Sequence, residues 1–530
     1  MRHGEHFSDN ERQVLAPYFT NLDGPVFALR NLPEVVKGAL FARYSRSAKS
    51  LRRLFLDEFA DQVPTAVAAS DVGLERADRL YERVFDEYGD DSVAQLGGAH
   101  LACEGASNLL TKILEWGRLM AYLEQSTRYI AYNDRCGGRW KYLVPAEIDR
   151  ADLRERFTSC LDRTFETYAR WIEPVEAHCR ACFPKAPGDP EGAYKRTIRA
   201  KALDALRGLL PAATQSNVGL FGTGQAYEAL LLRMRIHPLA EVRQYADLML
   251  TELRCVMPSF LKRVDRPDRG VRWSRYLQDT QAATAAIAQR LLPNAVGEVR
   301  DEVTLTDYDS DGEVKVVAAA LYAVSDLPDD QLLHLARQLP IDQRIAVLRA
   351  YVGLRENRRH KPGRAFERTS YRFDVLTDYG AFRDLQRHRM LTLEWQPLSP
   401  SHGYVVSDII RDAGALADWE RVMADSAALY DALRASGLEV VAPYAVSMAY
   451  RVRFYMDMNA REAMHMIELR TAPQGHPSYR RVCQRMHRLI DEQAGHHAIA
   501  AAMTFADHTE VELGRLNAER ASEQRRQRRG

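Results

Sequence analysis

The sequence has few of the features that mark secreted or membrane proteins. Its 530 residues include only 7 cysteines, an odd number that is widely scattered, so no disulfide framework is expected. No apolar run approaches the about 20 residues that a membrane-spanning helix needs. The polar N-terminal residues lack the apolar stretch of a signal peptide. We therefore expect a cytoplasmic protein without a membrane partner.

An excess of charge of one sign is also missing. The formal net charge is +1 at pH 7, so no whole-molecule field points to nucleic acid or a membrane surface. An excess of charge of one sign occurs only at the C-terminus, where residues 520–530 form a short basic tail. A solvated terminus is the simpler interpretation of this tail, and contact with RNA or phosphate is the alternative. Nucleic acid is thus not expected as a partner.

A complete metal-ligand set is missing as well. Cys179 and Cys182 form a CxxC pair with His178 beside them. Zinc needs four ligands, and no second pair follows at the spacing of a zinc finger. The sequence therefore predicts two half-buried thiols here and no metal site.

The length and the apolar pattern predict several domains that are mostly helical. A chain of 530 residues is too long for one core, and apolar residues recur at every third or fourth position. Residues 227–250 are one example, interrupted near Pro238, and residues 459–471 are another, with Asn459 as N-cap. We predict an α+β fold of two tandem domains, 1–265 and 301–507, with a linker at 266–300 and a basic tail at 508–530.

Both halves of the chain present the same features in the same order. Each half opens with small apolar residues, continues with an arginine-bearing stretch and closes with an apolar helix that carries a late arginine before a His-Pro pair. In the first half these are residues 38–47, 112–129 and Arg233, and in the second half residues 317–325, 382–395 and Arg470. This order predicts an old duplication.

Arg387, His388 and Arg389 stand side by side before an apolar, helix-like run that ends at Trp395. Crowding cationic groups is costly unless an anion lies nearby. If this segment is helical, Arg387 and Arg389 lie about 200° apart and could serve two phosphate-bearing ligands, with His388 between them. A solvated run of charge is the alternative.

Two further patterns are candidates for ligand binding. In an extended segment, Glu124, Ser126 and Arg128 share one face, and an acceptor, a hydroxyl and a guanidinium suit a sugar, an imide edge and a phosphate. A polar loop is the alternative. In the closing helix of the second half, Asn459 and Arg470 lie on nearly the same face, three turns apart. A snorkelling or ion-paired arginine would also explain Arg470.

Taken in this order, these motifs resemble ThyX, the family of flavin-dependent thymidylate synthases. The family signature is Arg-His-Arg followed by Glu-x-Ser-x-Arg-Tyr, with a later Asn-Ala-Arg helix that ends in Leu-Arg. The chain has "RHR", "EQSTRY" and "NAREAMHMIELR", and the resemblance spans roughly residues 35–260 and 310–495.

The signature is divided between the halves. Each half lacks residues that the other keeps. In the first half, Trp116-Gly117-Arg118 stand in place of the Arg-His-Arg, and "GTGQ" stands in place of Asn459-Ala460-Arg461. In the second half, Trp395, Pro397 and Ser399 stand in place of Glu124, Ser126 and Arg128. The family arginine before an apolar-Pro step survives only as Arg207. Because the family's active site lies between subunits of a homotetramer, the resemblance implies one complete site built from two incomplete halves, in a homodimer.

The resemblance implies reductive methylation of dUMP to dTMP, with FAD as cofactor and methylenetetrahydrofolate and NAD(P)H as co-substrates. The implied catalytic residues are Arg470, which would polarise the uracil ring, and Ser126. The implied nucleotide ligands are Glu124, Ser126, Arg128, Arg207, Arg387 and Arg470. The implied flavin ligands are Arg387, His388, Arg389, Asn459 and Arg461. Arg233 is ambiguous, since it could belong to a second, degenerate site.

One departure from the family leaves the substrate open. The family has Phe-Glu-His before the Arg-His-Arg segment, and its histidine touches the flavin, whereas this chain has Arg368 there. The alternatives are methylation of another pyrimidine or a small molecule with the same cofactors, and a non-catalytic scaffold.

Overall fold

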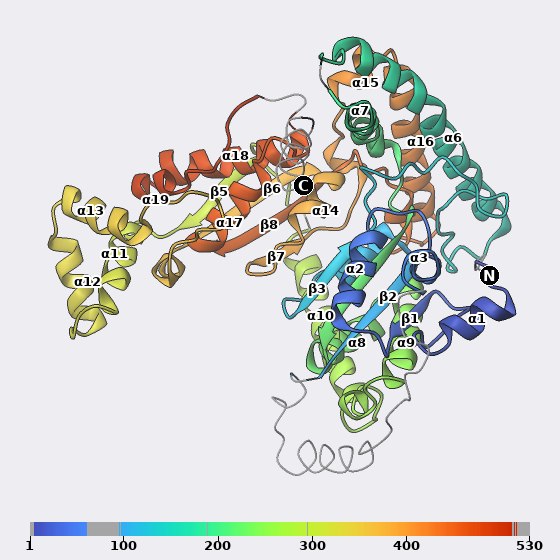
Figure 1. The fold of residues 1–530 in the computed structure, drawn as a ribbon, viewed down its shortest axis with the longest axis horizontal. Coiled ribbons are helices and arrows are strands. Elements are labelled where there is room, and N and C mark those ends of the chain that lie inside the picture. Colours follow the sequence, from blue (N-terminus) through green and yellow to red (C-terminus); the bar gives the residue numbers. More distant parts are fainter. Residues whose placement is uncertain are drawn as a thin grey trace. The chain divides into compact units, whose positions relative to one another are not determined.

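The structure is a computed structural model that describes residues 5–60, 95, 97–187, 189–293, 295–510, 514 and 516. The chain forms two compact units. Unit 1 consists of Met1–Ile172, Leu209–Gly297 and Leu416–Ser447, and unit 2 of Glu173–Gly208, Glu298–Ala415 and Met448–Gly530. Among the described residues helices predominate, and each unit contains one antiparallel sheet (Figure 1). The predicted α+β class is therefore confirmed.

The sheet of unit 1 has four strands in the order β1-β2-β4-β3. Its strands are β1 (Val26–Leu29), β2 (Gly98–Ser107), β3 (Met120–Glu124) and β4 (Gln215–Thr223). The helices of this unit are α1 (Asp9–Leu15), α2 (Glu34–Tyr44), α3 (Leu51–Glu58), α5 (Asn108–Leu114), α8 (Gly224–Arg235), α9 (Ala240–Arg254), α10 (Gly270–Leu291) and α16 (Leu416–Ala435). The long helix α6 (Ala151–Cys182) begins in unit 1 and ends in unit 2.

The sheet of unit 2 has the order β5-β6-β8-β7. Its strands are β5 (Val303–Tyr308), β6 (Ser370–Asp378), β7 (Thr392–Trp395) and β8 (Arg451–Asn459). The helices are α7 (Glu191–Leu206), α11 (Gly312–Tyr322), α12 (Asp329–Gln338), α13 (Ile341–Val352), α14 (Tyr379–Leu385), α15 (Asp408–Asp412), α17 (Ala460–Arg470), α18 (Pro477–Glu492) and α19 (His497–Ala502). Both sheets thus have the same strand order relative to the sequence, as a duplication would produce.

The two halves exchange a segment. Unit 2 contains α7 from the first half, and Ala449 donates a backbone hydrogen bond to Gly208 at 2.9 Å. Unit 1 contains α16 from the second half, which lies along α6 (Figure 1) and accepts hydrogen bonds from Arg170 at 2.6 Å and Trp171 at 2.8 Å through Asp418. The sequence predicted contiguous domains and gave no indication of this exchange.

The segment predicted as a linker contains the helix α10. Most of its side chains are exposed, but Ser274 is buried and donates a hydrogen bond to the Leu232 carbonyl of α8 at 3.3 Å. The basic tail at 520–530 lies outside the described residues. In the part of the chain that the structure describes, no helix combines the length and apolar character needed to span a bilayer.

The apolar run after the Arg-His-Arg segment is a strand, so its predicted helical character is wrong. Helix α14 ends at Leu385, and Thr392–Trp395 form β7, in which Leu393 is buried and pairs with Met456 of β8. Alternating burial along β7 satisfies the period of a strand. Arg387 and Arg389 are therefore not on a helix, and the expected angle between them does not apply.

Candidate functional site

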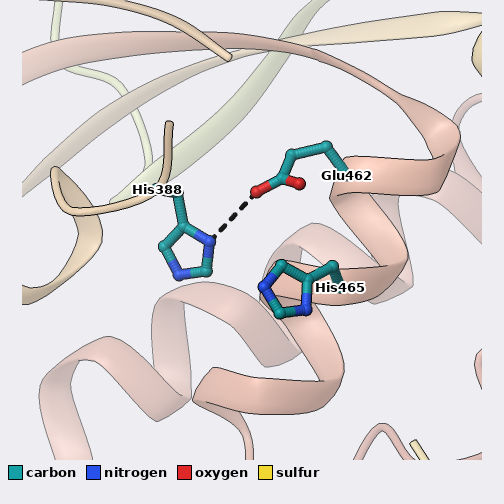
Figure 2. Close-up of side chains that lie close together, drawn as sticks. All are labelled: His388, Glu462 and His465. Carbon is teal, nitrogen blue, oxygen red and sulfur yellow. Dashed lines mark hydrogen bonds and ion pairs between the residues drawn. The ribbon is translucent and has the colours of Figure 1, made fainter. Parts of the chain in front are cut away.

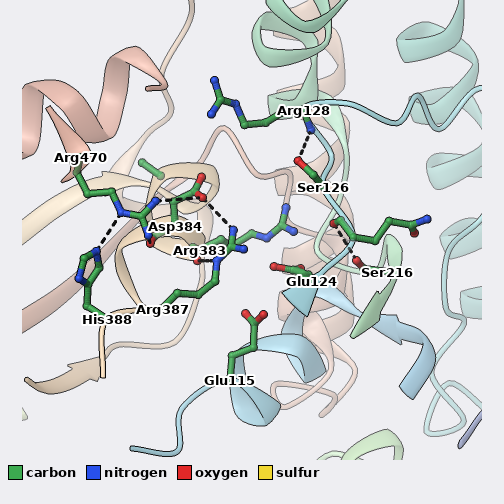
Figure 3. A network of polar contacts seen from close by, with 12 residues as sticks. Glu115, Glu124, Ser126, Arg128, Ser216, Arg383, Asp384, Arg387, His388 and Arg470 are labelled. Atoms are coloured by element: carbon green, nitrogen blue, oxygen red, sulfur yellow. Dashed lines mark hydrogen bonds and ion pairs between the residues drawn. The ribbon is translucent and has the colours of Figure 1, made fainter. Parts of the chain in front are cut away.

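Three guanidinium groups converge on Asp384 in unit 2. Its carboxylate lies 2.9 Å from Arg387 Nη2, 3.6 Å from Arg207 Nη1 and 3.7 Å from Arg470 Nη1. Figure 3 shows Asp384 with Arg387 and Arg470. The carboxylate side chain is 12% exposed. Three positive charges thus lie around this carboxylate, and guanidinium groups bind carboxylates and phosphates, so the arrangement suits an anionic ligand.

Arg207 is the member of this cluster that comes from the first half of the chain. Its side chain is 4% exposed, and its Nη2 has no hydrogen-bond partner in the described part of the chain. A buried N–H group without an acceptor costs about 1–3 kcal/mol, which an oxygen of a bound ligand would offset. Gly380 makes room for this side chain, because a Cβ at that position would lie 3.2 Å from Arg207 Nε and 3.3 Å from Nη2.

Local structure explains how the Arg-His-Arg segment is positioned. Asp378 caps α14 by accepting a hydrogen bond from the Ala381 N–H at 2.8 Å. The helix ends seven residues later, and Arg387 Nε then donates to the carbonyl of Arg383 at 3.3 Å. The end of α14 thus directs Arg387 back towards Asp384.

A second group of side chains forms a hydrogen-bonded chain from Arg470 to Glu462 through His388. Arg470 Nε lies 3.0 Å from His388 Nε2, and His388 Nδ1 lies 3.1 Å from Glu462 Oε1. Arginine only donates, so His388 Nε2 accepts, and the neutral imidazole carries its proton on Nδ1, which donates to Glu462. Burial lowers the pKa of His388 well below its ordinary value, and the charges of Arg470 and Arg387 lower it further. His388 is therefore neutral at physiological pH.

His465 completes a group that has the composition of a metal site (Figure 2). One ligand atom from each of His388, Glu462 and His465 lies within 4.8 Å of the others. A metal bound at His388 Nδ1 would displace the proton that His388 donates to Glu462. The positive charge of Lys361 also acts on both Glu462 and His465. The arrangement therefore favours a hydrogen-bonded chain over a bound cation, although the sequence pointed to neither.

Burial of these histidines predicts a loss of stability in mild acid. Burial lowers the pKa of His465 to about 4, whereas in the unfolded chain its pKa is about 6.5. The unfolded state binds the proton first, so stability is complete above about pH 6.5 and falls as the pH drops towards the folded value. We expect the urea midpoint to fall between about pH 7.5 and about pH 5 more steeply for the wild type than for His465→Gln. Equal slopes would contradict this assignment.

The remaining residues predicted to bind flavin lie around the start of α17. Asn459 is its N-cap, as predicted, and its side chain accepts a hydrogen bond from the Glu462 N–H at 2.9 Å. Arg461 donates to the carbonyl of Pro362 at 3.0 Å, and its side chain is 37% exposed. Arg389 is exposed. Asn459 and Arg470 lie at opposite ends of the helix, about 16 Å apart along its axis, so they could contact only different parts of one ligand.

In unit 1, Glu124 belongs to a buried charged cluster that the sequence did not predict. Lys112 Nζ lies 2.6 Å from Glu115 Oε2 and 3.3 Å from Glu124 Oε2, and all three side chains are at most 1% exposed. In the register that aligns Trp116 with Arg387, Lys112 stands where the second half has Arg383. This cluster fixes the end of β3.

Ser126 and Arg128 lie beyond that strand. The extended segment ends at Glu124, and the Arg128 N–H donates to Ser126 Oγ at 3.3 Å in the turn that follows (Figure 3). The Ser126 N–H donates to the carbonyl of Ser45 at 3.2 Å. Both side chains are half-buried. The single shared face that we predicted for all three residues is therefore wrong, because a local turn replaces the strand.

Among the described residues of the first half, the counterparts of Arg470 and His388 make different contacts. Arg233, the counterpart of Arg470, lies over the Trp116 ring at 5.2 Å. Gly117 occupies the position of His388, and its carbonyl accepts a hydrogen bond from Tyr122 Oη. A cation–π contact thus replaces the histidine contact.

The predicted residues are divided between the units. Unit 2 holds Arg207, Arg387, His388, Arg389, Asn459, Arg461 and Arg470, and unit 1 holds Glu124, Ser126 and Arg128. Asp384, Glu462 and His465 were not predicted from the sequence. Asp384 lies three residues before Arg387, and Glu462 lies three before His465, so the spacing of neighbours on one helix face was the available signal.

Comparison with known proteins connects this chain to a family. The family model described as "Thymidylate synthase complementing protein" matches residues 39–259 and 304–494. The chain is 38% identical to a protein of Chlamydia muridarum named only "UPF0159 protein", over 97% of this chain and 98% of that protein. The chain is 30% identical to a UPF0159 protein of Thermoplasma acidophilum, over 91% of this chain and 97% of that protein. A "Flavin-dependent thymidylate synthase" of Clostridium tetani is 24% identical over 37% of this chain and 73% of that protein.

Proposed function

The chain belongs to the family of thymidylate synthase complementing proteins, and from this membership we propose that it is a flavin-dependent enzyme that reductively methylates a uracil nucleotide, dUMP to dTMP. The observation that carries the proposal is the cluster around Asp384. Arg207 of the first half and Arg387 and Arg470 of the second half meet there within one unit. A nucleotide phosphate would satisfy the buried Nη2 of Arg207.

The donor set of unit 2 fits a flavin dinucleotide. Arg387, Arg389 and Arg461 offer guanidinium groups for a pyrophosphate, and His388 and Asn459 add neutral polar groups. When bound, FAD reduced by NAD(P)H would supply hydride, and methylenetetrahydrofolate would supply the carbon.

The residues of this chain would act by holding and polarising the nucleotide. Arg470 would direct its guanidinium towards a uracil oxygen, where negative charge develops, and such a preorganised donor can contribute about 3–4 kcal/mol. Arg207 and Arg387 would hold the phosphate. We propose that Glu124, Ser126 and Arg128 complete the nucleotide side of the site. Neither half contains both sets, which supports our proposal that the two halves complement each other, within a chain or within a homodimer.

Only one flavin should bind per chain. The first half has Trp116 and Gly117 where the second half has Arg387 and His388, and the contact between Arg233 and Trp116 fills its counterpart of the site. We expect FAD titration, followed by flavin absorbance and protein concentration, to saturate at one equivalent per chain. Saturation at two equivalents would show that the degenerate half also binds flavin.

The test of the proposed function is tritium release from [5-³H]dUMP by the FAD-loaded protein with methylenetetrahydrofolate and NADPH. Release that requires all components supports it. The flavin-touching histidine of the family is Arg368 here, and its Nη2 pairs with Asp329 at 2.7 Å. Other uracil derivatives therefore belong in the same assay. If the protein binds flavin but turns over only another pyrimidine, that pyrimidine is the substrate. If it does not bind flavin, it is a non-catalytic scaffold.

A further inference from the structure

Glu462 lies where its carboxylate can control the orientation of two site residues. It accepts the Nδ1 hydrogen of His388 at 3.1 Å, and His388 Nε2 accepts the Nε hydrogen of Arg470 at 3.0 Å. The side chains of His388, Glu462 and Arg470 are 3%, 10% and 16% exposed, so water competes little for these hydrogen bonds.

The contact that Glu462 makes is unusual for a glutamate at this position of a helix. It is the third residue of α17, and its N–H is capped by Asn459. A glutamate at this position commonly turns back to the N–H of the capping residue. Here the carboxylate contacts His388 instead, a residue 74 positions away in the sequence. The first turn of the helix also favours a negative charge.

We propose that Glu462 is a positioning residue that sets the direction of the Arg470 guanidinium through His388. Arg470 has a single Nε hydrogen, so its hydrogen bond to His388 fixes the plane of the guanidinium. In this plane Nη2 donates to the Asp384 carbonyl and Nη1 faces the Asp384 carboxylate. The inference rests on the proposed function, in which Arg470 polarises the substrate.

The neutral state of His388 is what makes this relay possible. A protonated imidazole would place an N–H against the Nε–H of Arg470, and the two would repel. Glu462 holds the one proton of His388 on Nδ1, so that Nε2 keeps a lone pair for Arg470. The same arrangement leaves no nitrogen of His388 available for a metal.

The experiment compares Glu462→Ala and Glu462→Gln with a matched control. Glutamine keeps an oxygen acceptor for His388, and alanine does not. Glu492→Gln is the control, because Glu492 ends α18 of the same unit, is 61% exposed and lies 3.7 Å from Arg485. Folding of each variant is checked by urea unfolding. The first measurement is the ¹⁵N spectrum of the His388 ring in protein without substrate, assigned by its loss in His388→Gln.

We expect a protonated Nδ1 and an unprotonated Nε2 in the wild type, in Glu462→Gln and in Glu492→Gln. In Glu462→Ala the two nitrogens should lose this distinction. In the FAD-loaded enzyme, Glu462→Ala should lower kcat for dUMP by about 10- to 100-fold, a range typical of groups that orient a functional ligand. Glu462→Gln should recover most of that loss, and the dissociation constant for FAD should change less than about twofold.

An unchanged His388 spectrum in Glu462→Ala would overturn the proposal. So would stoichiometric zinc in the wild type that either Glu462 variant loses, because a bound metal would then explain the carboxylate. The spectrum needs no substrate. If the wild type fails to turn over dUMP but its His388 signals respond to Glu462→Ala, the proposed function fails while the link between Glu462 and His388 stands.

Discussion

Arg207→Ala is expected to lower kcat/KM for dUMP by about 100- to 1,000-fold, the range observed when one preorganised donor is removed from an active site. The guanidinium is buried, lies 3.6 Å from Asp384 and keeps Nη2 without a partner among the described residues. In the proposed function this nitrogen binds the nucleotide. Calorimetric titration with dUMP should show the same loss of affinity, since the side chain would act in binding.

Arg199→Ala is the matched control. Arg199 lies on α7, the helix that precedes Arg207, but its side chain is 47% exposed and pairs with Glu176 at 3.0 Å. Its removal should leave kcat/KM within about twofold, because exposed ion pairs contribute little. Equal losses for both variants would assign the effect to the segment as a whole. Full activity of Arg207→Ala would exclude this residue from the nucleotide site.

Arg355→Ala is expected to lower the free energy of unfolding by about 3–5 kcal/mol. Arg355 forms two hydrogen bonds of 2.6 Å to Glu468 of α17 and one of 2.7 Å to the Ala502 carbonyl at the end of α19. Both side chains are 2% exposed. Removing the arginine leaves the Glu468 carboxylate buried without its counter-charge, and urea unfolding would measure the cost.

Two comparisons decide whether the buried charge is the cause. Arg364→Ala removes an arginine of the same unit that is 85% exposed and pairs with Glu367, so its effect should stay within about 1 kcal/mol. The double variant Arg355→Met/Glu468→Leu replaces the pair by apolar side chains and should recover most of the stability. A double variant as unstable as Arg355→Ala would point to lost packing instead.

The elements that the sequence predicted well are those with strong local signals. The interruption near Pro238 separates α8 from α9, and the Asn459 cap begins α17. Both depend on short-range chemistry, the conformational limits of proline and an N-cap side chain. The strand β7 was missed because an apolar run of this length fits a helix or a strand equally well. Its pairing with β8 decides the matter, and that contact is remote in sequence.

The candidate site was predictable in its cations and not in its anions. A crowded group such as Arg387 and His388 stands out in any sequence, whereas single acidic residues do not. Asp384 and Glu462 are ordinary helix residues until folding brings arginine and histidine side chains that are remote in sequence against them. The role of Lys112 was hidden in part for the same reason: Glu115 is a near neighbour in the sequence, but Glu124 contacts Lys112 only when the end of β3 folds against α5.

The exchange of α7 and α16 between the units bears on how such a chain can be inherited. If the two halves arose by duplication, either copy could at first have been lost without harm to the other. With α7 of the first half in unit 2 and α16 of the second half in unit 1, loss of either half would now remove a helix from the remaining unit. Both halves must therefore be inherited together, even where one of them has lost an arginine that the other keeps.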